Sequence, residues 1–185
     1  MRFLKSIFAG SSSGAKEKKG LSERGIAIFH HTSEVIEAEA VLRAAGLEVL
    51  VKGPPPDIQS GCDMVIEFPL INQLQVTELL EDKRIKPIRM AAVQDHLLEP
   101  VSLFNVKDFG DFLMVRAANM KITVDKNSLK IVNVSGGGCP DVPFLAEQMV
   151  GRHLHESPEP RKFGRTLCGY SLQLAYEEMK RRCPG

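Results

Sequence analysis

Four cysteines are the side chains of this 185-residue chain that could act as nucleophiles: Cys62, Cys139, Cys168 and Cys183. The thiolate is the reactive form of cysteine, and a helix N-terminus or a nearby cation increases the thiolate fraction. The residues around each cysteine therefore decide which of them is a candidate site.

Cys139 has the strongest local signal. It follows Gly136, Gly137 and Gly138, which free the backbone to turn sharply, and it precedes Pro140, which suits the first position of a helix. This arrangement predicts that Cys139 is an N-cap, where unpaired N–H groups and the helix dipole favour a thiolate. Two alternatives stay open: a purely structural turn, or a glycine loop whose N–H groups bind a small anion.

Cys168 is the second candidate because it falls in the first turn of a predicted helix. Thr166 is a natural N-cap two residues before it, and Lys162 and Arg165 add positive charge nearby. The same thiolate argument applies, with a buried core cysteine as the alternative.

Cys62 and Cys183 carry weaker signals. Cys62 lies between Gly61 and Asp63 at the start of a predicted strand, and the adjacent carboxylate disfavours a thiolate. Cys183 is two residues from the end of the chain and is interpreted as incidental. No CxxC occurs, so zinc-ribbon spacing is absent. A three-cysteine metal or iron–sulfur scaffold, assembled in space near His30 or His31, is kept as an alternative.

The elements of the first half follow the order strand–helix–strand–strand–helix–strand. Apolar runs and turn signals place them at residues 25–30, 34–45, 47–52, 64–68, 72–80 and 88–93. Thr32 or Ser33 is the expected N-cap of the first helix, and Glu34, Glu37 and Glu39 are expected on its exposed face. This order is the split βαβ pattern of a ferredoxin-like domain, over about residues 25–95.

The second half is predicted as a small α/β unit over about residues 110–183, which makes the whole chain α+β. Strands are expected at 112–117, 121–124 and 129–134, and helices at 142–150 and 166–182, with a proline-bearing linker at 155–161 between the helices.

The charge and the composition of the chain exclude some classes of partner. Hydrophobic residues make up 43% of the chain, which is typical of a globular protein, and no apolar run is long enough for a membrane helix. The net charge is +1, carried as basic ends around an acidic body, and Trp is absent, which argues against a nucleic-acid partner. Residues 1–24 are predicted to be a flexible basic tail without an export signal. We therefore expect a cytoplasmic protein with four thiols.

The stretch from Phe29 to Cys62 resembles the selenium/sulfur carrier-like family (DUF3343). The resemblance rests on Phe29-His30, the acidic helix with Glu39, Gly46, a second strand ended by prolines, and Asp57-Ile58-Gln59-Ser60-Gly61-Cys62. Asp63 stands where that family usually has glycine. The resemblance implies a domain over about residues 25–93 in which Cys62 holds sulfur or selenium. The second half resembles no characterised family.

The predicted function is a sulfur or selenium carrier that works as an accessory protein beside donor and acceptor proteins. Cys62 is the predicted carrier thiol, with Cys139 or Cys168 accepting or resolving the sulfur by thiol exchange. No cofactor is implied. The alternatives are a regulatory or small-anion-binding module that uses the glycine turn, and the metal scaffold.

Overall fold

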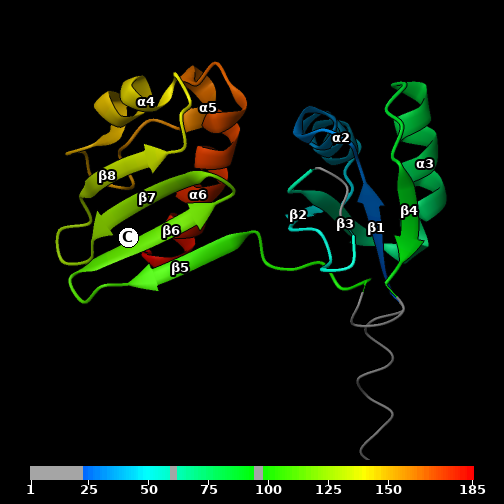
Figure 1. Cartoon of the computed structure of the whole chain (residues 1–185), viewed down its shortest axis with the longest axis horizontal. Helices are drawn as coiled ribbons and strands as arrows, with labels where there is room; N and C mark the ends of the chain where they lie inside the picture. The colour runs from blue at the N-terminus through cyan, green and yellow to red at the C-terminus, as the bar shows by residue number, and fades with distance from the viewer. Residues whose placement is uncertain (1–22, 59–61, 94–97) are drawn as a thin grey trace, which may run out of the picture.

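The computed structural model describes residues 23–58, 62–93 and 98–185. The predicted basic tail therefore lies, but for its last two residues, outside the described part of the chain, and so does the Gln59-Ser60-Gly61 segment before Cys62. The described residues form two four-stranded antiparallel sheets, which Figure 1 shows in separate halves of the molecule. The fold is α+β, as the sequence predicts.

The N-terminal domain has the ferredoxin-like order of elements. They are β1 (Arg24–Ile28), α2 (Thr32–Ala44), β2 (Leu50–Lys52), β3 (Val65–Pro69), the 3-10 turn η1 (Leu70–Asn72), α3 (Gln73–Asp82) and β4 (Arg89–Ala92). The strands lie in the order β2-β3-β1-β4, which places the first and third strands at the centre. This arrangement confirms the split βαβ prediction.

Both faces of this sheet are covered. Alternate strand residues such as Ala27 and Ile66 join the core beneath α2 and α3. The residues between them, such as Ile26 and Val65, face the other way and pack against Ile58, which follows the three prolines after β2. The continuous apolar run of β1 is thus explained by burial on both faces rather than on one.

The C-terminal unit is an antiparallel meander with three helices. Its elements are β5 (Phe104–Asp108), β6 (Phe112–Ala117), β7 (Met120–Asp125), β8 (Ile131–Gly136), α4 (Val142–Met149), α5 (Pro160–Phe163) and α6 (Leu167–Arg182). Strand β5 and the short helix α5 are additions to the predicted elements. In β5 the side chains are exposed or half-buried because it is an edge strand, so its residues lack the apolar signature that marks a buried strand.

Helix α6 connects the two halves. Its residues Leu172, Ala175 and Met179 belong to the core of the C-terminal unit, whereas Tyr170, near its N-terminal end, belongs to the core of the N-terminal domain. In Figure 1, α2 of one half faces α5 and α6 of the other.

A buried hydrogen bond crosses this junction. The Tyr170 hydroxyl donates to Glu39 Oε2 of α2 over 2.7 Å, and Arg43 pairs with Glu39 Oε1 at 2.9 Å. Glu39 is only 3% exposed, so the prediction that it lies on an exposed helix face is wrong. The reason is tertiary: Tyr170 and α6 cover that face of α2. Burial and the Glu39 carboxylate raise the pKa of Tyr170 far above its usual value, so the hydroxyl stays a donor.

Candidate functional site

The structure pairs Cys139 with Cys168 in a disulfide, with their Cα atoms 6.7 Å apart. The expectation of four thiols is therefore wrong for these two residues. The pair joins the turn before α4 to the first turn of α6. Cys168 is 8% exposed and packs in the core, as its alternative interpretation predicts, whereas Cys139 is half-buried at the surface. A small thiol approaching from solvent therefore meets Cys139 first.

Thr166 holds both sulfur-bearing residues in place. It is the N-cap of α6, as predicted, and its Oγ1 accepts the main-chain N–H of Cys168 at 3.2 Å. The same oxygen lies 3.0 Å from Cys139 Sγ. Asn119 Nδ2 donates to Cys168 Sγ over 3.8 Å from the turn between β6 and β7.

Asp141 fixes the loop before α6. One carboxylate oxygen, Oδ2, accepts the main-chain N–H groups of Arg165 and Thr166, each at 2.7 Å. Although desolvation acts in the opposite direction, these hydrogen bonds lower the pKa of Asp141 below its ordinary value. Asp141 is not among the site residues predicted from the sequence. An Asp two residues after a cysteine, at the start of a helix, was the available signal.

The predicted N-cap at Cys139 is wrong by two residues. Helix α4 begins at Val142, and Asp141 is its N-cap. The Cys139 carbonyl accepts the N–H of Val142 at 3.2 Å, so a turn separates the cysteine from the helix. Helix α6 therefore contains one cysteine of the disulfide, Cys168, whereas α4 contains neither cysteine.

The glycines before Cys139 have different surroundings. A Cβ at Gly136, the last residue of β8, would collide with the Met120 side chain. Gly138 has a φ of +65°, which lets the chain turn towards α4, and Gly137 has open space around it. Close packing and turn geometry thus account for Gly136 and Gly138, and anion binding by this turn stays a prediction.

Cys62 lies in the other half of the molecule. It is 4% exposed, and its Sγ is 3.7 Å from Oγ1 of Thr32, the first residue of α2. The N-cap of α2 is His31 rather than the predicted Thr32 or Ser33, because Glu34 Oε2 reaches back to the N–H groups of His30 and His31 at 3.1 and 3.0 Å. Because Thr32 is the first residue of α2, the N-terminal end of this helix lies beside Cys62.

The three predicted site cysteines thus form two centres, with Cys62 in one half and the Cys139–Cys168 disulfide in the other. Ile36, one turn after Thr32 on α2, lines a pocket together with Thr166, which contacts Cys139. Cys183, by contrast, is the C-cap of α6 and lies in the core of the C-terminal unit. Burial raises the pKa of its thiol, which suits a structural role.

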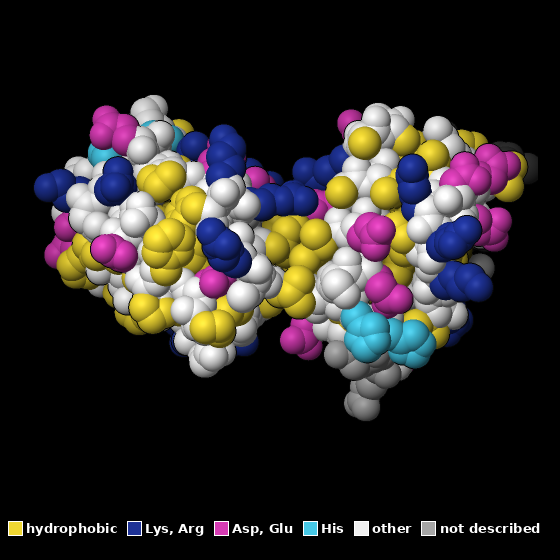
Figure 2. Space-filling model, turned by 90° about the horizontal axis from the view of Figure 1, so that it is seen from above, with side chains coloured by type: hydrophobic (Ala, Val, Ile, Leu, Met, Phe, Trp, Pro, Cys, Tyr) yellow, Lys and Arg dark blue, Asp and Glu magenta, His cyan; other side chains and the backbone are white. Residues whose placement is uncertain are grey.

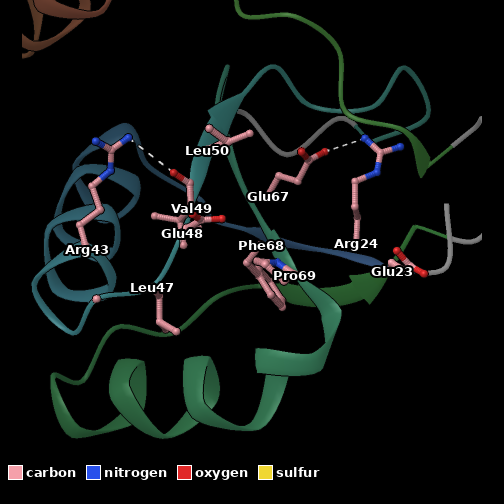
Figure 3. A pocket seen from close by; sticks show the side chains of 11 residues that line it. Glu23, Arg24, Arg43, Leu47, Glu48, Val49, Leu50, Glu67, Phe68 and Pro69 are labelled. Atoms are coloured by element: carbon pink, nitrogen blue, oxygen red, sulfur yellow. Dashed lines mark hydrogen bonds and ion pairs between the residues drawn. The ribbon is translucent and has the colours of Figure 1, made fainter. Parts of the chain in front are cut away.

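A cavity of about 780 Å³ contains none of the site cysteines. It lies in the N-terminal domain beside the turn from α2 to β2 and the end of β3 (Figure 3). Its cations have partners: Arg24 pairs with Glu67 and Glu99, each at 3.0 Å, and Arg43 with Glu39. Both cations of this cavity are therefore paired with carboxylates, and its lining contains no cysteine.

The described residues contain neither a candidate metal site nor a helix that could span a membrane. Among residues 23–58, 62–93 and 98–185, no three His, Cys, Asp or Glu side chains form a group that could hold a metal ion. None of the helices in that part of the chain is long and apolar enough to cross a bilayer.

The fold and the cysteine centres define a class: a ferredoxin-like domain with a buried cysteine, joined to a meander unit with a cysteine pair. Residues 24–91 match the family described as "Putative Se/S carrier protein-like", and residues 103–183 match a domain of unknown function, DUF8182. An uncharacterized protein of Methanocaldococcus jannaschii is 42% identical over 160 residues, which are 85% of this chain and 80% of the relative. No solved structure matches the chain. The chain belongs to the family of this archaeal protein, and its N-terminal domain is Se/S carrier-like.

Proposed function

We propose that the protein is an accessory carrier that holds a sulfur or selenium atom on Cys62 and passes it on by thiol exchange. The observation that carries the proposal is the position of Cys62 within the Se/S carrier-like domain, with its sulfur 3.7 Å from Thr32 in the first turn of α2. A persulfide or selenosulfide is an anion near neutral pH, and the positive end of a helix stabilises an anion.

The burial of Cys62 fits a carrier better than a free catalyst. A sulfane sulfur on a side chain that is 4% exposed is shielded from thiols in solution. Small molecules in solution are then expected to exchange sulfur with Cys62 slowly, and donor and acceptor proteins that open this region are expected to speed loading and unloading. The proposed partners are therefore proteins with their own reactive cysteines, in the cytoplasm.

The Cys139–Cys168 pair supplies the second half of the exchange when it is reduced. The Cys139 thiolate attacks the outer sulfur of the Cys62 persulfide, and Cys62 leaves as a thiolate. Cys168 then attacks Cys139 Sγ, which forms the disulfide and expels hydrosulfide. The sulfane sulfur gains two electrons, and the two thiols lose them. The proposed sequence ends in the same Cys139–Cys168 pairing that the structure contains.

Intact-mass measurement tests the carrier cysteine. The protein is purified without oxygen and incubated with sodium polysulfide, and the mass is expected to rise by one sulfur atom that maps to Cys62. Cys62→Ser should abolish the added atom. Cys183→Ser is the matched control because Cys183 is also a buried thiol, and it should load like the unmodified chain. Loading that survives Cys62→Ser contradicts the proposal.

A second variant separates carriage from transfer. In Cys168→Ser the attack on Cys139 Sγ is impossible, so sulfur that leaves Cys62 should remain on Cys139 as a persulfide, without release of hydrosulfide. Hydrosulfide release at the unmodified rate in this variant would remove the cysteine pair from the proposal and leave Cys62 as the carrier.

A further inference from the structure

A pocket of about 480 Å³ opens at the junction of the two halves, beside the disulfide. Its walls include Ile36 of α2 and, from α5, the loop after it and the start of α6, Arg161, Arg165, Thr166 and Tyr170. Thr166 lines this pocket and its Oγ1 is 3.0 Å from Cys139 Sγ, so one side chain borders both the pocket and the more exposed sulfur of the pair. Figure 2 shows Lys and Arg side chains gathered at this junction, next to apolar ones.

The lining of this pocket includes two cations and no carboxylate, whereas the lining of the larger cavity includes both. Arg161 and Arg165 are exposed, and within the described residues neither guanidinium forms an ion pair. Arg161 lies over the Tyr170 ring, 5.5 Å from its centroid. Two carboxylates lie close by: Asp141 accepts two main-chain N–H groups and also interacts electrostatically with Arg165, and Glu39 is held by Tyr170 and Arg43.

We infer that this pocket binds an anionic thiol of low molecular weight, which reduces the Cys139–Cys168 disulfide. The two guanidinium groups attract the anionic group of the ligand, such as a carboxylate, and the ligand's thiolate is left to approach Cys139. Binding an anion here costs no existing ion pair.

The chemistry balances with two molecules of the thiol. The ligand thiolate attacks Cys139 Sγ, the Cys139–Cys168 bond breaks, and Cys168 leaves as a thiolate in the first turn of the 16-residue helix α6, where the helix dipole stabilises it. A second thiol attacks the sulfur of the bound ligand and releases Cys139. The ligand is oxidised to its symmetrical disulfide, and the protein pair gains two electrons and two protons.

This inference goes beyond the carrier proposal because it requires only the cysteine pair and the pocket. It also places the protein in a reaction sequence: whatever reaction oxidises the pair, a supply of small anionic thiol regenerates it. If Cys62 carries no sulfur at all, the inference still stands.

Three thiols of similar size and different charge test it: 3-mercaptopropionate, 2-mercaptoethanol and cysteamine. The reduction of the pair is followed by alkylation and peptide mass at low ionic strength. Each rate is divided by the rate of the same thiol with bis(2-hydroxyethyl) disulfide, which removes differences in thiol pKa and nucleophilicity. We expect the anionic thiol to exceed the neutral one by about tenfold, and the cationic one to be slowest.

The variants locate the effect. Arg161→Gln combined with Arg165→Gln should bring the anionic-to-neutral ratio close to one. Lys162→Gln is the matched control, because Lys162 is an exposed cation in the same segment but pairs with Glu159 at 3.1 Å, and it should keep the ratio. Equal normalised rates in the unmodified protein, or a ratio that the double variant leaves unchanged, overturn the inference. The same experiment in Cys62→Ser separates its failure from that of the carrier proposal.

Discussion

The hydrogen bond between Tyr170 and Glu39 predicts a specific loss of stability when it is removed. Tyr170→Phe deletes the hydroxyl and keeps the ring, so the apolar contacts of Tyr170 with the carrier-like domain remain. Glu39 Oε2 then loses its donor in a place where water has little access, while Oε1 keeps Arg43. The substitution therefore isolates one buried hydrogen bond to a charged group.

The expected size follows from the character of this bond. Hydrogen bonds to charged groups contribute about 1.5–3 kcal/mol, and an abandoned buried acceptor costs a similar amount. We expect Tyr170→Phe to lower the free energy of unfolding by about 2 kcal/mol. With a urea dependence of about 1–3 kcal/mol per molar, the unfolding midpoint should fall by roughly 1 M.

Urea denaturation monitored by circular dichroism measures this loss. Tyr176→Phe is the matched control, because the Tyr176 hydroxyl donates to the Leu154 and Ser157 carbonyls within the C-terminal unit alone. A double-mutant cycle with Glu39→Gln should give a coupling of about 1 kcal/mol or more for Tyr170 and almost none for Tyr176. A midpoint for Tyr170→Phe within about 0.2 M of the unmodified chain would refute the reasoning, given the urea slope above.

Two further predictions concern the surroundings of the disulfide. Gly136→Ala should lower the free energy of unfolding by about 1–3 kcal/mol, because the new methyl group collides with Met120. Gly137→Ala has open space around it and should change the free energy of unfolding by less than about 1 kcal/mol. Equal effects of the two variants in thermal or urea unfolding would contradict this prediction. Because the pKa of Asp141 is lowered in the folded state, its contribution to stability is present above the ordinary value of 3.8 and is lost as the pH falls through the lower folded value. Asp141→Asn should therefore be less stable than the unmodified chain at pH 6 and equally stable near pH 2, and a difference that persists unchanged to acid pH would contradict the assignment.

Local sequence signals determined much of this protein. The apolar runs and turn residues predict the ferredoxin-like order of the first half, because that order depends on periodicities and breakers within a few residues of each element. The N-cap of α6 at Thr166 is local for the same reason: a hydroxyl two residues before Cys168 reaches that residue's own N–H. The resemblance around Cys62 likewise rests on one contiguous segment, and the family comparison agrees with it.

Tertiary structure decided what joins distant residues. Cys139 and Cys168 meet because α4 and α6 begin at the same corner of the C-terminal unit, and no spacing rule links cysteines 29 residues apart. Glu39 looks like one more surface carboxylate on an acidic helix until Tyr170, 131 residues later, covers it. The pocket of Arg161 and Arg165 likewise exists only where α2 meets α5 and α6. Burial and pairing depend on which surfaces pack together. The local sequence pattern of a segment indicates only that segment's own periodicity and caps.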